Sequence, residues 1–387
     1  NCFCERSESI GACPNCGYDP TWDADTYPLA LPHGYVLCNK YILGRVLGQG
    51  GYGITYLAMD KWLGTKVAVK EYFPEIGATR TSNTCYVTAS SVKKQEDYEK
   101  GKSDFLQEAR VLAAFSENPN IVKIHGYFEE NGTAYFAMDY VEGISFQKYI
   151  GNQGGKIHWK DAYEKLLPII TALEEVHKKE IIHRDISPDN IYITTDGVMK
   201  LLDFGAARYQ SLNQSHSLDI VVKHGYAPFE QYKRRSKQGP YTDVYALCAC
   251  FYAAVTGVLP PDAPERIEDD KIEHFSTIGI DVPQAVADVV FKGLEVKSEN
   301  RYQNMTELRE ALVQAVELDI SVVIDTDIDS NTEETVLPLS PDGTEHTNND
   351  DSQTHEEIPD NNEEATFLKN NQEEIGEAIV IALADYL

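Results

Sequence analysis

The sequence lacks any run of 18 apolar residues, so it offers no membrane-spanning helix, and it has no secretory signal. It is also poor in basic residues, with 34 Lys and Arg against 62 Asp and Glu. Because no basic stripe can neutralise phosphates, we expect no nucleic-acid partner. The scattered cysteines suit buried thiols in a reducing compartment, so we expect a cytoplasmic protein. Since the chain begins at Asn1 and not at Met, we expect it to be a fragment, from which an upstream piece or a membrane tether is missing.

The eight cysteines do not have the pattern of a disulfide framework, because half of them cluster near the N-terminus and half are scattered. The stretch CPNCG, with Cys13 and Cys16, has the spacing of a zinc knuckle, in which two thiolates converge on one ion. Cys2 and Cys4 are the expected second pair, although only one residue separates them. Residues 1–18 are therefore predicted to hold a structural Zn²⁺, with unliganded thiols as the alternative.

The negative charge is concentrated at the C-terminal end. Residues 317–387 hold 20 acidic residues and one basic residue, a net of −19 out of −28 for the whole chain. With few aromatics, this composition predicts a mostly disordered acidic tail. Its end, residues 374–387, has the apolar spacing of an amphipathic helix, although a strand fits as well. Thr326 and Thr335 are candidate phosphoacceptors for a phosphothreonine-binding partner, and a solvated linker is the alternative.

The chemically richest stretch is residues 183–205, which read HRDISPDN, then a predicted hairpin, then DFG. Asp185 and Asn190 share one tight loop, and Asp203 follows the hairpin. Phosphoryl transfer needs a carboxylate that accepts the proton of an attacking hydroxyl, and oxygen ligands for Mg²⁺ (or Mn²⁺) on the nucleotide phosphates. The two motifs at this separation predict a phosphoryl-transfer centre that uses ATP.

A glycine-rich turn precedes this centre in the sequence. Residues 48–53 read GQGGYG and lie between two predicted strands. A dinucleotide-binding fold would place a helix after the glycines, so the strand that follows excludes it. Backbone amides of such a turn can instead close over phosphate oxygens. Lys70 ends the next predicted strand, 17 residues beyond Gly53, and is the candidate partner of the α- and β-phosphates.

Two further predictions concern the surroundings of Lys70. Residues 104–115 have the apolar periodicity of a helix that is buried on one face. Glu108 in this helix is the candidate ion-pair partner of Lys70, and an exposed helix charge is the alternative. The polar residues 71–101 in between are expected to form an inserted loop or hairpin.

In this order, the motifs GQGGYGITYLA, VAVKEYFP, HRDISPDN and GYAPFEQY make residues 41–315 resemble a eukaryotic-like (Hanks-type) bacterial serine/threonine protein kinase. The resemblance implies an α+β fold of two lobes, with a small antiparallel sheet and a helix in the first lobe and a mostly helical second lobe. The expected parts are a linker (19–40), an N-lobe (41–138), a hinge (139–143), a C-lobe (144–316) and the tail.

The resemblance also implies roles for single residues. Asp185 is expected to be the catalytic base, Asn190 and Asp203 to bind Mg²⁺, and protein substrates to be phosphorylated. The expected ATP contacts are Leu47, Gly48, Gly50, Gly53, Thr55, Ala68, Lys70, Met138, Asp139, Val141, Asn190 and Asp203. The expected structural residues are Asp243, which braces the catalytic loop, and Glu230, which pairs with Arg301.

Two positions depart together from the pattern of this family. Ser187 stands where a lysine usually steadies the transferring phosphate, and Lys223 stands where a threonine is usual. We hypothesise a swap in which Lys223 supplies the charge and is thus a catalytic residue. A solvated Lys223 and an enzyme that tolerates the missing cation are the alternative. A pseudokinase scaffold and a small-molecule kinase are the rival readings of the whole chain.

Arg184, next to Asp185, suggests control by phosphorylation, because an arginine at the active centre is well satisfied by a phosphoserine. Serines are available in the stretch 206–222. The candidate phosphosites are Ser211, Ser215 and Ser217, with Ser217 preferred.

Overall fold

The structure is a computed structural model. It describes residues 26–329 except 52, 82, 83, 205–207, 210–221, 234 and 235, together with residues 3, 12 and 13; the side chains of 208, 209 and 320–329 are not described.

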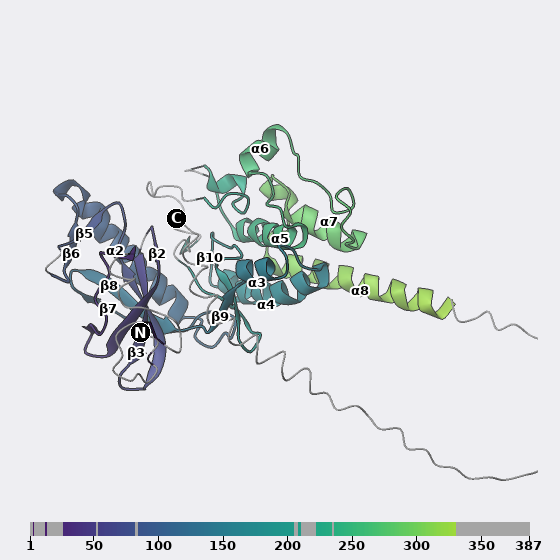
Figure 1. Ribbon diagram of the computed structural model, residues 1–387. Helices are drawn as coiled ribbons and strands as arrows, with labels where there is room; N and C mark the ends of the chain where they lie inside the picture. The colour runs from purple at the N-terminus through teal and green to yellow at the C-terminus, as the bar shows by residue number, and fades with distance from the viewer. Residues whose placement is uncertain are drawn as a thin grey trace, which may run out of the picture.

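Strand-forming segments between residues 36 and 139 make a six-stranded antiparallel sheet, the centre of the N-lobe (Figure 1). The inward-facing residues of its strands pack into one core. In sheet order the strands are β1 (Val36–Leu37), β2 (Tyr41–Gly50), β3 (Gly53–Asp60), β4 (Thr65–Tyr72), β8 (Thr133–Asp139) and β7 (Ile124–Glu130).

One long helix, α2 (Gln95–Ala113), packs against β7 and β8. It begins nine residues before the stretch in which the sequence predicts a helix. Its buried face includes Phe105, Ala109 and Leu112, which recur at helical spacing. The inserted residues before α2 form a hairpin, β5 (Ala78–Arg80) and β6 (Val87–Ala89), and a 3₁₀ turn, η1 (Val92–Lys94). One of the two predicted forms of the insert, the hairpin, is therefore present.

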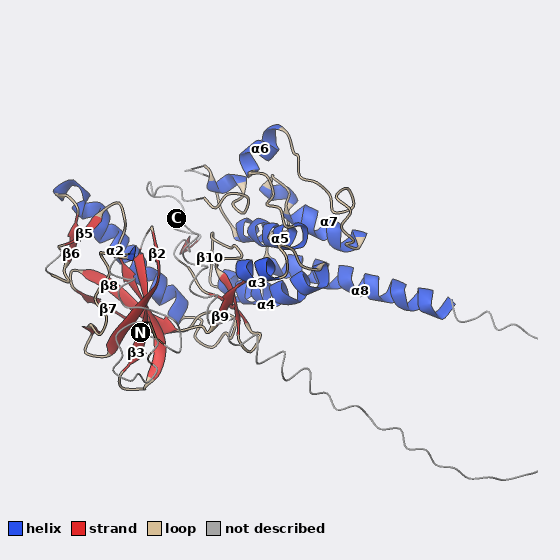
Figure 2. Ribbon diagram, in the orientation of Figure 1, coloured by secondary structure: helices blue, strands red, loops and turns tan. Residues whose placement is uncertain are grey.

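The second lobe is mostly helical, and Figure 2 shows the large sheet and α2 in the first lobe and the other labelled helices in the second. Its helices are α3 (Phe146–Asn152), α4 (Trp159–Lys178), α5 (Pro240–Thr256), α6 (Ala263–Glu268), α7 (Gln284–Gly293) and α8 (Met305–Asp329), with 3₁₀ turns η3 (Phe229–Gln231) and η4 (Ser298–Asn300). Its short strands are β9 (Gly143–Ser145), β10 (Ile181–Ile182), β11 (Ile191–Thr194), β12 (Met199–Leu201) and β13 (Arg208–Tyr209).

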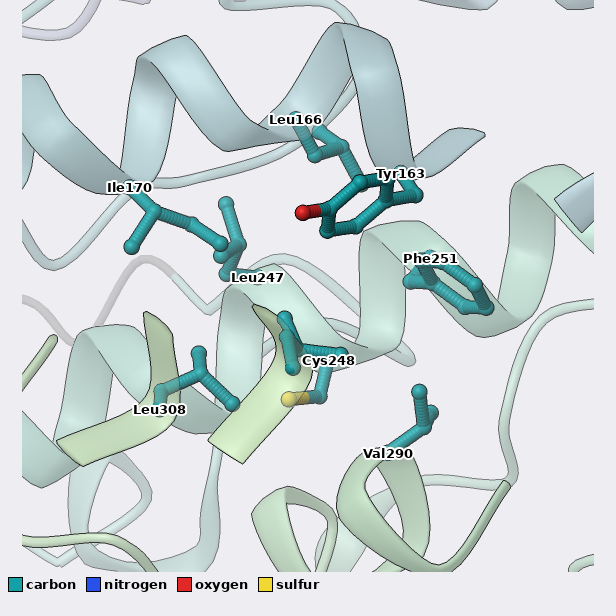
Figure 3. A pocket seen from close by; sticks show the side chains of 9 residues that line it. Tyr163, Leu166, Ile170, Leu247, Cys248, Phe251, Val290 and Leu308 are labelled. Carbon is teal, nitrogen blue, oxygen red and sulfur yellow. The ribbon is translucent and has the colours of Figure 1, made fainter. Parts of the chain in front are cut away.

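Helix α5 is the centre of the C-lobe core, because every residue from Thr242 to Thr256 is buried. A helix that is apolar all round is expected in such a position. It packs against α4, α7 and α8. Figure 3 shows the small apolar cavity between these helices, with Leu166, Leu247, Cys248 and Leu308 in its wall. Its volume of about 10 Å³ is at most that of one water probe, so it is a packing defect and not a ligand site.

The prediction of a linker over residues 19–40 is wrong for the part that the structure describes. Leu31 and Leu37 are 2% and 0% exposed, and β1 joins the edge of the sheet. The Tyr56 hydroxyl also accepts a hydrogen bond of 3.0 Å from the Leu31 N–H. The prolines and glycine of this segment prevent a long element, as the sequence indicates, but its apolar side chains are buried in the N-lobe.

Helix α8 extends past the predicted boundary between kinase domain and tail at residue 316 and continues to Asp329, so the first residues of the predicted tail are helical. No Gly or Pro interrupts the sequence from Met305 to Asp329, so nothing ends the helix earlier. Residues 374–387 lie outside the described residues. Among the helices that the structure describes, none is both long and apolar enough to cross a membrane.

Candidate active site

The loop between β10 and β11 carries the first two candidate catalytic residues. The Asn190 side chain folds back over Asp185, and its Nδ2 donates to the Asp185 carbonyl (2.8 Å) and to Asp185 Oδ2 (2.9 Å). The loop is closed by the hydrogen bond from the Asn190 N–H to the Ser187 carbonyl (3.0 Å). These contacts fix the direction of the Asp185 carboxylate. They also leave the amide oxygen of Asn190 as its group that can bind a cation.

The hairpin β11–β12 brings Asp203 to this loop, as its sequence predicts. Its turn contains Gly197 at φ +84°, a backbone conformation that favours glycine. After the hairpin, the Leu202 N–H donates to the Asn190 carbonyl (3.0 Å). The carboxylate of Asp203 therefore follows directly on the backbone that pairs with Asn190, and the two oxygen donors expected for a magnesium site lie on adjacent segments.

Asp243, from the buried helix α5, fixes the backbone of the loop between β10 and β11 through hydrogen bonds. It is 0% exposed and accepts hydrogen bonds from the backbone N–H groups of His183 and Arg184, both at 2.8 Å. Burial alone would raise the pKa of Asp243, but the hydrogen bond and charge of His177 outweigh it and lower the pKa. A charged carboxylate is thus fixed under the loop. Arg184 has a φ of +73°, so the loop is held in a conformation that non-glycine residues rarely adopt.

His177 is a site residue that the sequence reasoning missed. Its Nε2 lies 2.7 Å from Asp243 Oδ2, with both side chains buried. The available signal was its position four residues after Leu173, which places it on the apolar face of α4. A polar ring on such a face needs a buried partner, and here the partner is the carboxylate that braces the loop.

The electrostatics of Asp185 suit a group that handles a proton. Burial raises the pKa of Asp185, while the charge of Lys223 and the hydrogen bond from Asn190 oppose that effect. Burial also lowers the pKa of His183, so the imidazole stays neutral beside the carboxylate. An aspartate whose pKa is raised is a better proton acceptor than an exposed one.

Lys70 joins the N-lobe to this centre. Its Nζ lies 3.1 Å from Asp203 Oδ1 and 3.4 Å from Glu108 Oε1, so the predicted contact with Glu108 of α2 is present. Burial would lower the pKa of Lys70, but the two carboxylates outweigh it and raise the pKa, so the ammonium stays charged. Burial raises the pKa of Glu108 to about 7, although the ammonium opposes this. Glu108 therefore changes its protonation state close to neutral pH.

The sheet places four of the predicted ATP contacts on one face. Thr55 pairs with Lys70, and Ala68 pairs with Met138. Because side chains two residues apart or directly opposite share a face, these four point the same way. Asp139 and Val141 follow at the end of β8. The remaining predicted contacts, Leu47, Gly48, Gly50 and Gly53, lie on β2 and β3.

Gly53 is required by close packing of the backbone. A Cβ built at this position lies 2.2 Å from the carbonyl oxygen of Glu71 on β4, which no side chain can tolerate. Glycine therefore lets the turn between β2 and β3 lie directly over the strand that carries Lys70. A turn built in this way fits a phosphate chain held close to backbone amides, and the oxygen donors of Asn190 and Asp203 fit a bound Mg²⁺.

A second ion pair holds the segment that follows the catalytic hairpin. Arg301 donates to both carboxylate oxygens of Glu230, at 2.8 and 3.1 Å, so the predicted pair is present. The neighbouring Gln231 donates to the Arg184 carbonyl at 2.7 Å. The segment 222–232 is therefore attached both to the core of the C-lobe and to the catalytic loop.

Some predicted residues lie outside the described residues, namely Cys2, Cys4 and Cys16 of the predicted zinc module and Ser211, Ser215 and Ser217. Cys13 is described and is 3% exposed. Within the described part of the chain, no group of three or more His, Cys, Asp or Glu side chains could hold a metal ion.

A sheet lobe whose glycine turn and lysine face the acidic loop of a helical lobe defines the kinase class of phosphotransferases. The chain belongs to the protein kinase family, whose domain model, described as "Protein kinase domain", matches residues 41–314. Among solved structures, "PpkA-294 apo form" is 33% identical, with a TM-score of 0.64, and the match covers 73% of this chain and 99% of that one.

Curated relatives agree with this family. Serine/threonine-protein kinase PrkC of Bacillus subtilis is 27% identical over 76% of this chain. Serine/threonine-protein kinase D of Synechocystis is 29% identical over 71% of this chain. The chain spans 42% of the length of PrkC and 52% of that of kinase D, so it matches about half of each.

Proposed function

We propose that this chain is a protein serine/threonine kinase, which transfers the γ-phosphate of ATP to a hydroxyl of a protein substrate. The observation that carries the proposal is the convergence of Lys70, Asp203, Asn190 and Asp185. Lys70 Nζ lies 3.1 Å from Asp203, while Asn190 holds the Asp185 carboxylate at 2.9 Å. The relatives PrkC and kinase D, which carry serine/threonine-protein kinase in their names, support the same activity.

Each residue then has a distinct part in the reaction. Asp185 orients the hydroxyl and accepts its proton, as the bond from the hydroxyl oxygen to the γ-phosphorus forms and the bond to the leaving ADP oxygen breaks. Asn190 and Asp203 would hold Mg²⁺ (or Mn²⁺), which when bound neutralises charge on the phosphates. Lys70, oriented by Glu108, would bind the α- and β-phosphates.

The adenine would be held by the backbone of the hinge. The Asp139 N–H already donates to the Lys123 carbonyl at 2.9 Å, so Val141 is left to supply the amide donor. The Asp139 side chain lies 2.8 Å from His125, away from this role. Met138 and Ala68, which share a face of the sheet, would border the base.

A protein substrate, and not a metabolite, is favoured by the segment 222–232. Its attachment through Glu230 and Gln231 gives the C-lobe a fixed surface beside Asp185 on which a peptide can lie.

The test is a panel of protein and metabolite acceptors with labelled ATP and Mg²⁺, with Asp203→Asn as the matched control. We expect label in protein only, and none with the variant. Label in metabolites alone would identify a small-molecule kinase, and nucleotide binding without any transfer would identify a pseudokinase.

We also propose a structural Zn²⁺ on Cys2, Cys4, Cys13 and Cys16, supported by the CPNCG spacing. Metal analysis should find about one zinc per chain, and none in Cys13→Ser/Cys16→Ser. Zinc-free purified protein would refute the site.

Three further proposals rest on the sequence. Autophosphorylation is proposed at Ser211, Ser215 or Ser217, and phosphopeptide mass spectrometry after ATP treatment tests it. A phosphothreonine-binding partner is proposed for the tail through Thr326 or Thr335, and capture by the phosphorylated but not the unphosphorylated tail tests it. A cytoplasmic location is proposed from the scattered thiols, and cell fractionation tests it.

A further inference from the structure

The catalytic loop lacks a positive charge where the phosphoryl group would be transferred, since residues 185–190 read DISPDN. Lys223, which comes from the segment 222–232, extends into this loop. Its Nζ donates to Ser187 Oγ at 2.9 Å and to Asp189 Oδ2 at 2.6 Å. The solvated lysine considered from the sequence is not what the structure contains, because the Lys223 side chain is only 26% exposed.

Both ends of this contact are fixed. Ser187 is 0% exposed, so its hydroxyl is enclosed by protein and needs a hydrogen-bond partner there, which the ammonium of Lys223 supplies. The Lys223 carbonyl accepts hydrogen bonds from the N–H groups of Tyr226 (3.1 Å) and Ala227 (2.9 Å), which hold its backbone in a turn. Gly225, which lies within this turn, has a φ of +76°, and its N–H donates a hydrogen bond to Asp262 Oδ1 at 2.7 Å.

The charge of Lys223 reaches the reacting centre. It is one of the charges that oppose the rise in the pKa of Asp185 caused by burial. The ammonium contacts Ser187, which stands two residues after Asp185, so it lies on the same loop as the proton acceptor. In phosphoryl transfer, negative charge spreads over the oxygens of the transferring group next to that acceptor.

We infer that Lys223 is the catalytic cation of the transfer, and that Ser187 and Asp189 are the residues that position it. This inference rests on the proposed kinase function. Lys223 would contact oxygens of the γ-phosphoryl group while Asp185 accepts the hydroxyl proton and ADP leaves. The catalytic cation thus belongs to the segment 222–232 and not to the catalytic loop. The position of this segment against the C-lobe therefore sets the position of the charge.

The first test is Lys223→Met, which keeps the length of the side chain but removes the charge. We expect kcat to fall about 10²- to 10³-fold, as for the loss of one preorganised charge, while the KM for ATP changes less than about threefold. The matched control is Lys271→Met, an exposed lysine paired only with Asp269, which should leave turnover unchanged. Melting temperature and fluorescent-nucleotide affinity verify that the variants are folded.

The second test moves the charge. Because Ser187 Oγ lies 2.9 Å from the ammonium, a lysine at position 187 can supply a charge to the same place. The double variant Ser187→Lys/Lys223→Thr should turn over at least about tenfold faster than Lys223→Thr alone. A merely structural role of Lys223 would not be restored in this way.

Two outcomes overturn the inference: Lys223→Met with turnover within about threefold of the wild type, or a loss of turnover that the double variant does not restore. Both presuppose an active wild-type chain. An inactive wild type would instead refute the proposed function, so the two failures are distinguishable.

Discussion

Arg80 is the residue of the N-lobe whose loss we expect to be most damaging outside the active site. Its guanidinium pairs with Glu71 and donates to the Leu29 carbonyl, and the side chains of Arg80 and Glu71 are 6% and 0% exposed. The Glu71 carboxylate also accepts hydrogen bonds from the hydroxyls of Tyr56 (2.7 Å) and Tyr135 (2.6 Å). This buried network joins the segment before β1, the inserted hairpin and the strand that carries Lys70.

Replacement of Arg80 by Met keeps a long apolar stem but leaves the Glu71 carboxylate buried without a cation. Removal of one partner of a buried ion pair costs about 3–5 kcal/mol, so the free energy of unfolding of the N-lobe should fall by that amount. Burial already raises the pKa of Glu71 against the opposing charge of Arg80. The loss should therefore be smaller at pH 5 than at pH 8, because a protonated Glu71 no longer needs the cation.

Urea unfolding followed by circular dichroism measures the effect at the two pH values. The control is the double variant Glu71→Gln/Arg80→Met, which removes both charges and keeps an amide for the tyrosine hydroxyls. It should be more stable than Arg80→Met alone. A single variant that unfolds at the wild-type midpoint, or a double variant that is less stable than the single one, would refute this account of the network.

Three more predictions concern the site and the C-lobe. Burial raises the pKa of Glu108 to about 7, and only the charged form of Glu108 forms an ion pair with Lys70. We therefore expect kcat/KM for ATP to rise as the pH increases through about 7. A Glu108→Gln variant that keeps the same rise would contradict this. Gly53→Ala would place a Cβ 2.2 Å from the carbonyl oxygen of Glu71 on β4. Overpacking of this kind costs about 1–3 kcal/mol, which predicts an about 5- to 150-fold weaker affinity for nucleotide in a fluorescent-nucleotide titration. An unchanged affinity would show that the turn is not packed as described. Arg301→Met should destabilise the C-lobe by about 3–5 kcal/mol in calorimetry, because the Glu230 carboxylate stays buried; an unchanged melting profile would argue against the pair.

The sequence predicts that the side chains of the candidate active site come together, because the proposed chemistry requires fixed residue types at fixed spacing. Asp185 and Asn190 have to share one loop, and Asp203 has to follow a short hairpin. The contact of Lys70 with Glu108 is predictable from the buried face of the predicted helix, and the Glu230–Arg301 pair from the family resemblance, although each joins residues that are far apart in the chain.

What the sequence does not predict depends on long-range packing. Leu31 and Leu37 stand among prolines, which indicate an irregular segment but not that it is buried in the N-lobe. The Glu71–Arg80 pair needs the hairpin to fold back on β4, and neither charged residue has a local signal of burial. Helix α8 is long because no helix breaker interrupts it. The prediction of a disordered tail gave more weight to the acidic composition after residue 316 than to this absence of a breaker.

The most direct test of the central claim is a phosphoamino-acid analysis after incubation of the chain with γ-labelled ATP, Mg²⁺ and a mixed protein acceptor. Asp185→Asn, which keeps the size of the side chain but cannot accept the proton, is the comparison. We expect phosphoserine or phosphothreonine with the wild type and a rate at least about 10²-fold lower with the variant. Equal labelling by the two proteins, or no protein-bound label with the wild type, would contradict the assignment of this site as a phosphoryl-transfer centre.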